Sequence, residues 1–209
     1  MIAIVDYDAG NLRSVKRACD AVGIGSVVTR DPEVVLRAER VIFPGVGAAP
    51  HAMQILRAGG LDEALKAAYA NGTPILGICL GTQIILDRSE EGDVETLGLI
   101  PGVTVRFRLE DRSLKIPHMG WNAVRVVRPH PLLEGVEEGD EFYFVHSYYP
   151  APADPKDVLA VTDYGKPFCC ALGRKNLFAT QFHPEKSGRF GLRILERFAG
   201  WDGRGQSGE

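Results

Sequence analysis

The sequence predicts an α/β fold with a mostly parallel central sheet, helices on both of its faces and antiparallel strands added by the second half of the chain. The first half of the 209 residues alternates strand-like and helix-like segments, and the second half consists largely of short strand-like runs. Alternating strands and helices indicate a parallel sheet, because each crossover helix packs against the sheet whose strands it connects. A chain of this length buries a core large enough to fold without a disulfide or a metal.

The first half of the chain contains four strand-like segments separated by helical patterns. The expected strands are 2–7, 26–30, 40–47 and 74–79, and the expected helices are 11–23, 31–39 and two patterns within 50–71 that are split at Gly59 and Gly60. Asn11 is expected to cap the first helix and Gly23 to end it, and Pro32 suits the first turn of the second helix.

The second half changes character and is dominated by strand-like runs with turns between them. Strands are expected at 103–107, 122–127, 142–148, 157–164, 168–174 and 177–182, with a loop or strand edge over 114–122 and an amphipathic helix over 189–201. The last residues are expected to be a frayed tail, so that residues 1–200 form one domain and 201–209 lie outside it. In open α/β sheets, sites form where parallel strands end, and the stretches GVG and GIC both follow such strands.

Charge and cysteine content exclude several classes of function. A net charge of −3 provides no footprint for nucleic acid or for a membrane surface. The N-terminal apolar run is short and has no signal-peptide features, and a cytoplasmic protein is expected. Cys19, Cys169 and Cys170 fit buried positions in a helix and a strand, the last two on opposite faces. Neither C-x-x-C pairs nor zinc-site spacing occurs, so no metal or other cofactor is expected.

Cys79 stands apart because glycines flank it in the stretch GICLGTQ. Cysteine is commonly a small buried hydrophobe, and that alternative stays open for a lone Cys. Gly77 and Gly81, however, produce the G-x-C-x-G spacing of a nucleophile elbow, in which a strand turns sharply into a helix. A helix over 80–86 would place the thiol at a helix N-terminus, an environment that lowers thiol pKa values.

His183 and Glu185 are the strongest candidates for a base and its orienting group. They lie two residues apart in TQFHPEKS, after an apolar strand, with Pro184 stiffening the turn between them. A carboxylate beside an imidazole fixes its tautomer and favours its charged form. The alternative is an ordinary surface turn, which the presence of an elbow cysteine makes less favourable. Cys79, His183 and Glu185 are therefore the predicted catalytic residues.

Acyl chemistry at Cys79 also requires donors for a developing oxyanion. The turn Pro44–Gly47 offers backbone N–H groups with no side chain in the way, and we expect Val46 and Gly47 to contribute there. The N–H of Leu80, directly after the nucleophile, is the expected second donor. Alone, this turn could equally be an ordinary strand-to-helix connection.

Together these motifs resemble a known family. GICLGTQ with a late QFHPE is similar to the signature pair of the class I, or triad, glutamine amidotransferases. The stretches DYDAGNLRSV, KIPHMGWN, FYFVHSYY and RFGLRIL narrow the resemblance to the glutaminase subunits of imidazole glycerol phosphate synthase, over nearly the whole chain. The resemblance implies a flavodoxin-like sheet. Two departures occur: Asp8 stands where the family usually has Gly, and Thr82 where it commonly has Met. Neither removes a catalytic group.

The resemblance also implies a reaction and a partner. Cys79 would attack the side-chain amide of L-glutamine to form a γ-glutamyl thioester, with His183 moving the protons and Glu185 orienting His183. Residues implied to hold glutamine are Gly47, Gln83, Ser147 and Tyr148. The released ammonia would pass to a (β/α)₈-barrel cyclase subunit, which forms imidazole glycerol phosphate and an aminoimidazole carboxamide ribotide in histidine biosynthesis.

A face for docking that cyclase is expected around the HMGWN stretch and the N-terminal loop. Exposed Trp and Met side chains are enriched at interfaces. The candidates are Asn11, Met119, Trp121, Asn122 and Lys186. Trp121 could instead anchor the core, and His51, His130 and His146 are expected to be structural.

Three other functions fit these motifs less well. Another amidotransferase of the same class, serving anthranilate, pyridoxal phosphate or guanylate synthesis, is disfavoured by HMGWN and FVHSYY. A cysteine peptidase or stress hydrolase on a related sheet would not need the HPE turn. A non-enzymatic scaffold would require the loss of a triad member, and all three are present.

Overall fold

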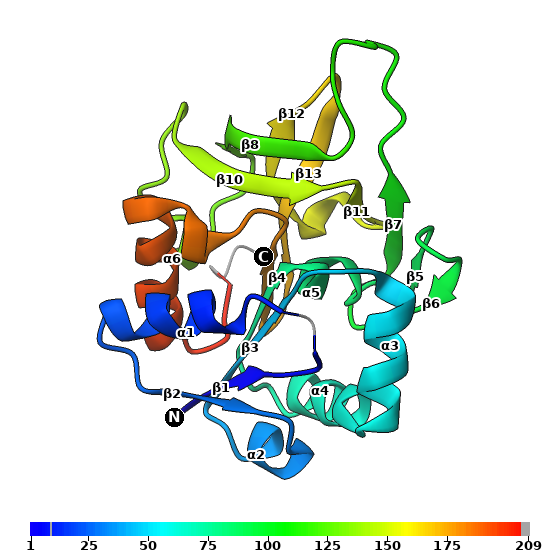
Figure 1. The fold of residues 1–209 in the computed structure, drawn as a ribbon. Coiled ribbons are helices and arrows are strands. Elements are labelled where there is room, and N and C mark those ends of the chain that lie inside the picture. Colours follow the sequence, from blue (N-terminus) through cyan, green and yellow to red (C-terminus); the bar gives the residue numbers. More distant parts are fainter. Residues whose placement is uncertain (9, 206–209) are drawn as a thin grey trace.

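An eight-stranded sheet forms the centre of the computed structural model, which describes residues 1–8 and 10–205. The strand order is β2 (Ser26–Thr29), β1 (Ile2–Val5), β3 (Arg40–Gly45), β4 (Ile75–Cys79), β14 (Leu177–Thr180), β13 (Pro167–Arg174), β12 (Val158–Asp163) and β9 (Arg125–Val126). The first five strands are parallel, and β13, β12 and β9 continue the sheet antiparallel (Figure 1). The predicted mixed sheet is confirmed.

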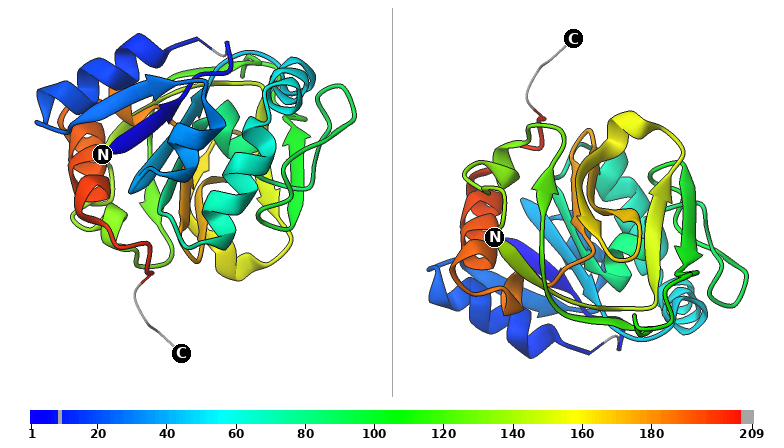
Figure 2. Two further views of the ribbon diagram at one scale, coloured as in Figure 1. Left: turned by 90° about the horizontal axis from the view of Figure 1, so that it is seen from below. Right: turned by 90° about the horizontal axis from the view of Figure 1, so that it is seen from above.

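Helices cover both faces of this sheet, as Figure 2 shows. On one face lie α1 (Leu12–Ala21) and α6 (Gly188–Gly200), and on the other lie α2 (Pro32–Leu36), α3 (Ala49–Ala58) and α4 (Leu61–Ala70). Two buried apolar clusters therefore form, one on each side of the strands. Cys170 belongs to the first cluster and Cys169 to the second, which confirms that their side chains point to opposite faces.

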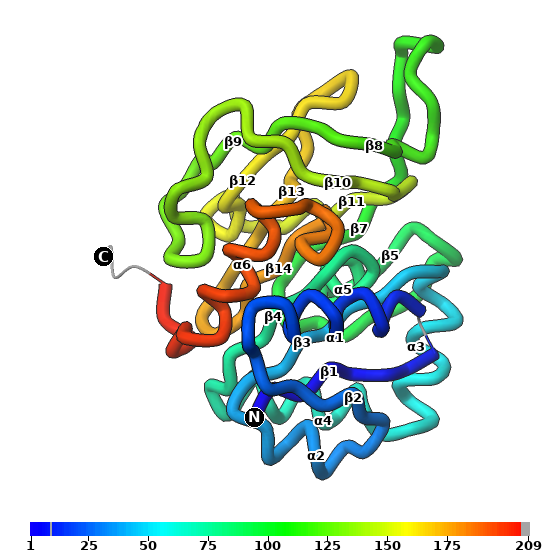
Figure 3. The backbone as a smooth tube through the Cα atoms, turned by 60° about the vertical axis from the view of Figure 1, so that its left-hand side comes forward, coloured from blue at the N-terminus to red at the C-terminus, as the bar shows by residue number. Residues whose placement is uncertain are grey.

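A second layer of strands crosses the sheet edge at which β4 ends (Figures 1 and 3). It contains the pair β8 (His118–Ala123) and β10 (Glu141–His146), and a four-stranded sheet of β11 (Tyr148–Pro152), β7 (Gly102–Arg106), β5 (Arg88–Ser89) and β6 (Val94–Glu95). Short 3₁₀ turns η1 (Pro131–Leu133), η2 (Pro155–Asp157) and η3 (Pro184–Lys186) connect the later elements. The expected loop or edge over 114–122 is thus partly a paired strand, β8.

The helix after Cys79 is shorter than expected. The sequence predicts a helix over 80–86, but α5 ends at Gln83 (Leu80–Gln83). The carbonyl oxygens of residues 84–86 accept backbone hydrogen bonds from residues 97–100, a distant segment that sequence periodicity does not reveal. A single turn carries little of a helix dipole, so that part of the expectation for Cys79 loses its support.

The two ends of the chain refine two further expectations. Asn11 is the N-cap residue of α1, as expected, but it adopts a left-handed conformation and its side chain makes no capping hydrogen bond. Trp201, placed in the frayed tail 201–209, is 5% exposed. Its ring packs against His130, and its indole N–H donates to the Arg204 carbonyl at 2.6 Å. Residues 206–209 lie outside the described residues. No helix of the described part is long and apolar enough to cross a membrane.

Candidate active site

Cys79 ends β4 in a backbone conformation that few non-glycine residues adopt, with φ 53° and ψ −105°. Its flanking glycines allow close packing. A Cβ on Gly81 would lie 1.9 Å from the Phe43 carbonyl oxygen, and one on Gly77 would lie 2.9 Å from the Ala179 Cβ. Strained residues of this kind concentrate at functional sites. The geometry agrees with the predicted elbow, and the nucleophilic role of Cys79 stays a prediction.

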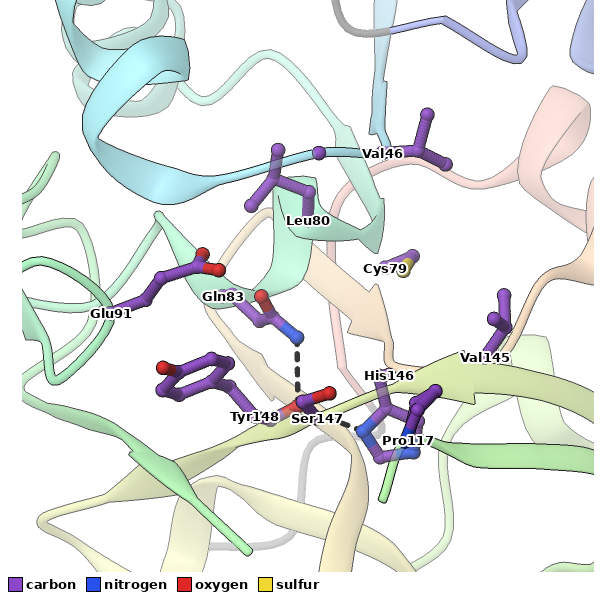
Figure 4. A pocket seen from close by; sticks show the side chains of 11 residues that line it. Val46, Cys79, Leu80, Gln83, Glu91, Pro117, Val145, His146, Ser147 and Tyr148 are labelled. Atoms are coloured by element: carbon purple, nitrogen blue, oxygen red, sulfur yellow. Dashed lines mark hydrogen bonds between the residues drawn. The ribbon is translucent and has the colours of Figure 1, made fainter. Parts of the chain in front are cut away.

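Cys79 faces a pocket of about 360 Å³, shown in Figure 4. The pocket brings together the residues predicted for the oxyanion hole and for glutamine binding, namely Val46, Gly47, Leu80, Gln83, Ser147 and Tyr148. It also includes residues for which no role was predicted, namely Glu91, Pro117, Val145 and His146. Segments from β3, β4, β10 and β11 therefore meet at one cavity.

His183 and Glu185 form a hydrogen-bonded pair beside this pocket. His183 Nδ1 lies 2.7 Å from Glu185 Oε1, and both side chains are fully buried. Within the described residues His183 Nε2 has no partner, so this nitrogen is available for proton transfer. Because β4 and β14 are neighbours in the sheet, Cys79 and His183 reach the same edge from adjacent strands.

The surroundings of His183 keep its imidazole charged. Burial acts to lower the pKa of His183, but the electrostatic interaction with Cys79 and the Glu185 carboxylate raise it to about 10. An opposite charge close to a buried group favours its ionised form. At pH 7 the His183 imidazole is therefore protonated beside the Cys79 sulfur.

Asn11 contacts the same pair from the N-terminal loop. Its Nδ2 donates to Glu185 Oε1 and lies 3.4 Å from His183 Nδ1. This side chain was predicted to cap a helix and to belong to the docking face. The structure instead directs it toward the His183–Glu185 pair, a contact across 174 residues of sequence. No local pattern could have indicated that contact.

Two glutamines connect the pocket wall to the nucleophile. Gln181 Nε2 lies 3.7 Å from Cys79 Sγ as a donor, and Gln181 Oε1 accepts from Gln83 Nε2 at 3.2 Å. Gln83 Nε2 also donates to the Tyr148 carbonyl at 2.8 Å (Figure 4). Gln181 stands in the QFHPE motif, but its partners are set by the fold and no role was predicted for it.

Glu91 is the only carboxylate that lines the pocket among the described residues. Its Oε2 accepts from the Ala49 backbone N–H at 2.8 Å, which fixes the side chain at the start of α3. Sequence reasoning missed this residue because it lies in the run EEGD, a composition typical of a solvated loop.

The two departures from the family pattern both fit the structure. Thr82 is fully buried, and its Oγ1 donates to the Thr180 carbonyl at 2.6 Å, which ties α5 to β14. Asp8 adopts φ 60°, a region that favours glycine. Its carboxylate pairs with Arg30, which also contacts Asp6 at 2.8 Å.

The remaining docking candidates fall into two groups. Met119 and Trp121 are 62% and 53% exposed, so the structure excludes Trp121 as a core anchor. Lys186 is exposed and lies over the Tyr143 ring at 5.7 Å. Asn122, by contrast, points inward: its Nδ2 lies 3.2 Å from His118 Nε2 and donates to the Asp163 carbonyl at 3.0 Å. The place of Asn122 in the docking face stays a prediction.

The histidines expected to be structural differ in their surroundings. His51 is exposed on α3, whereas His130 is buried and stacks on Phe178 at 4.7 Å. His146 is buried in the wall of the pocket. In the described part of the chain, no group of three or more His, Cys, Asp or Glu side chains is placed to hold a metal ion.

Comparisons with known proteins agree with this geometry. The family model for glutamine amidotransferase class-I matches residues 3–200. The imidazole glycerol phosphate synthase subunit HisH of Desulfovibrio desulfuricans is 53% identical over 203 residues, covering 95% of this chain and 93% of that protein. Its counterpart in Chromobacterium violaceum is 48% identical over 209 residues, covering 97% and 98%.

Solved structures support the fold. A glutamine amidotransferase crystal structure superposes with a TM-score of 0.75 at 19% identity, covering 96% of this chain and 100% of that one. The structure of PurLQS from Thermotoga maritima gives a TM-score of 0.70 at 19% identity, covering 94% of this chain and 96% of that one. Identities this low show a shared fold alone.

Proposed function

The chain belongs to the class-I glutamine amidotransferase family and is a glutaminase of that family; we propose that it is the glutaminase subunit of an imidazole glycerol phosphate synthase, with Cys79 as its nucleophile. One observation carries the assignment of the residues. The strained Cys79 faces a pocket, while a buried His183–Glu185 pair reaches the same sheet edge from the neighbouring strand. Nucleophile, base and orienting carboxylate are thus supplied by one local arrangement.

The reaction follows from these positions. The Cys79 thiolate attacks the side-chain amide carbon of glutamine, and the tetrahedral oxyanion is held by backbone N–H groups of the Val46–Gly47 segment and of Leu80. As the carbon–nitrogen bond breaks, the His183 imidazolium donates a proton to the departing ammonia. Water then attacks the thioester with neutral His183 as the base, which releases glutamate and restores the Cys79 thiolate and the protonated His183.

The pocket also provides complementary groups for the amino-acid end of glutamine. The Glu91 carboxylate pairs with the α-ammonium group, since it is the one carboxylate that the described lining contains. Both hydrogen-bond contacts of the Gln83 amide nitrogen go to protein carbonyl oxygens, which leaves Gln83 Oε1 to accept from the substrate. Gly47, Ser147 and Tyr148 complete the cavity around the bound glutamine.

The proposal extends to the partner. Met119, Trp121 and Lys186 form the docking face for a cyclase subunit with a (β/α)₈ barrel, and the ammonia passes to it directly. L-Glutamine is the small-molecule substrate, no cofactor takes part, and residues 1–200 act as one domain. The four cysteines are free, which fits the reducing conditions of the cytoplasm.

Glutamate release from L-glutamine, with and without the cyclase, tests this proposal. Cys79→Ala should reduce the rate in the complex by at least about 10³-fold, because the nucleophile acts as one unit with its base. Complex formation should persist. Cys19→Ala is the matched control: it also removes a buried thiol, but from α1, and turnover should continue. Glutamine turnover by the Cys79→Ala variant would overturn the assignment of Cys79 as the nucleophile. Faster hydrolysis of other amides than of glutamine would favour the alternative that the chain is a cysteine peptidase or stress hydrolase.

A further inference from the structure

Two buried histidines, His118 on β8 and His146 on β10, take no part in the proposed mechanism. The second of them lines the pocket. They face each other directly in the antiparallel ladder, one from each strand. His118 Nδ1 lies 3.0 Å from His146 Nε2, and His146 Nδ1 lies 2.8 Å from the Tyr148 carbonyl oxygen. Asn122 Nδ2 lies 3.2 Å from His118 Nε2. The four groups form one continuous chain of hydrogen bonds.

The ends of this chain fix the direction of every bond in it. The Asn122 amide is oriented by two independent partners, because its Nδ2 donates to the Asp163 carbonyl and its Oδ1 accepts from the Ala123 N–H. Asn122 Nδ2 is therefore a donor, and His118 Nε2 must accept. A neutral His118 then carries its proton on Nδ1 and donates to His146 Nε2.

The opposite end requires the same tautomers. The Tyr148 carbonyl can only accept, so His146 must carry its proton on Nδ1 and accept at Nε2. Both ends thus agree on one arrangement, with an N–H at Nδ1 of each imidazole. Because a donor at one end and an acceptor at the other require the same tautomers, a single arrangement of protons satisfies every hydrogen bond of the network.

The surroundings keep both rings neutral and restrict the rotation of His118. Phe144 and Tyr164 pack against the His118 ring at interplanar angles of 30° and 32°, with centroids 4.8 and 4.1 Å away. Burial lowers the pKa of His118 to about 4 and that of His146 to about 3, so each has a single N–H at pH 7. Aromatic packing therefore restricts rotation of the His118 ring, and at pH 7 neither ring carries a second proton.

The chain of hydrogen bonds continues beyond the Tyr148 carbonyl to the nucleophile. The carbonyl that receives His146 Nδ1 also accepts Gln83 Nε2 at 2.8 Å, as Figure 4 shows. Gln83 then contacts Gln181, which donates to Cys79 Sγ. The Tyr148 carbonyl is therefore the junction at which the two histidines meet the residues that hold glutamine.

We propose that Asn122, His118 and His146 are positioning residues for glutamine, which hold the Tyr148 carbonyl, and through it the Gln83 amide, in the orientation that binds substrate. This inference rests on the proposed function, since it assigns its effect to the glutamine pocket. It also connects the pocket to the docking face. On β8 the exposed Trp121 alternates with His118 and Asn122, so a partner that shifts β8 against β10 changes the His118–His146 contact.

Substitution of His118 tests the chain through the KM for glutamine, measured in the complex with the cyclase. His118→Leu removes both hydrogen bonds and should raise KM about tenfold, because it leaves the acceptor of His146 unpaired. The value of kcat should stay within about threefold. His118→Asn retains a donor near the place of Nδ1 and should restore KM to within about threefold of the wild type. His51→Leu, the same change at an exposed site, should leave KM unchanged.

Long-range ¹H–¹⁵N spectra of the imidazoles test the tautomers without any substitution, and the His118→Asn spectrum assigns the signals. Both rings should be Nδ1–H tautomers at pH 7. An Nε2–H or a doubly protonated His146 overturns the inference, as does a KM within twofold of the wild type in folded His118→Leu. If His118→Leu does not fold, the spectra and the His118→Asn kinetics decide. Absence of glutaminase activity in the wild-type complex would instead overturn the proposed function.

Discussion

At the scale of single residues, the chemistry depends on charges held where water cannot screen them. His183 and Glu185 have fully buried side chains, and Cys79 is 5% exposed. Local patterns predicted these three residues, because glycine spacing marks an elbow and two positions of separation keep His183 and Glu185 together. Asn11, Glu91 and Gln181 have their roles through partners 40 or more residues away, which no local pattern encodes.

The raised pKa of His183 predicts how Glu185→Gln changes the pH dependence of glutaminase activity. A raised pKa keeps the imidazolium, which protonates the departing ammonia, present until the pH approaches about 10. Removing the carboxylate charge lowers that pKa, so the alkaline limb of kcat/KM should move to lower pH by at least about one unit. The pH–rate profile of the complex measures this shift.

Glu91→Gln provides the matched comparison for Glu185→Gln. It neutralises the carboxylate that lines the pocket and that has no hydrogen bond to His183. It should raise the KM for glutamine and leave the alkaline limb in place. An alkaline limb that does not move in Glu185→Gln would show that this carboxylate does not set the protonation of the base.

At the scale of elements, the sequence predicted whether a segment forms a helix or a strand better than it predicted where the element ends and which strands pair. The strands of the first half and the helices around Gly59 and Gly60 are confirmed. The helix after Cys79 was overextended because residues 84–86 pair with the backbone of residues 97–100, a distant segment, instead of continuing the helix. The segment of β8 was expected only as a loop or strand edge, because its partner β10 supplies the pairing from a separate part of the chain.

The two tryptophans, each close to an element end, should respond in opposite ways to truncation. Trp201, buried after α6, fills space beside His130, so Trp201→Ala should lower the free energy of unfolding by about 3–5 kcal/mol. Trp121 is half exposed on β8, so Trp121→Ala should change the free energy of unfolding by less than about 0.5 kcal/mol. The Trp121→Ala variant should instead raise the Kd of the complex with the cyclase at least about tenfold. Urea unfolding and titration with the cyclase measure the two quantities, and an unchanged Kd would remove Trp121 from the docking face.

At the scale of the whole molecule, the topology places the candidate pocket beneath the layer that carries the proposed docking face. β10 contributes Val145 to the pocket lining, and its partner β8 carries Met119 and Trp121. Sequence alternation predicted the parallel half of the sheet. It could not predict that β8 and β10 would cross over the end of β4, since that depends on packing between distant segments.

This arrangement predicts that the isolated chain is a poor glutaminase. The pocket wall includes β10, so a partner on the docking face can change the pocket, and hydrolysis without an acceptor would waste glutamine. Glutamate release should be low for the chain alone and should rise strongly on addition of the cyclase with its nucleotide ligand. Steady-state assays over a titration of the cyclase measure the increase. Full activity of the chain alone would contradict coupling between the subunits.

The four thiols differ enough in their surroundings that Cys79 can be labelled selectively. Burial raises the pKa of Cys19 to about 11 and of Cys170 to about 12, and it also raises that of Cys169. None of these three lines the pocket, whereas Cys79 does. A neutral electrophile in modest excess should therefore label one sulfur per folded chain before the other three react, with no need to replace the other cysteines. The stoichiometry of labelling then counts intact active centres in any preparation, and a fluorophore attached there would report when the pocket is filled.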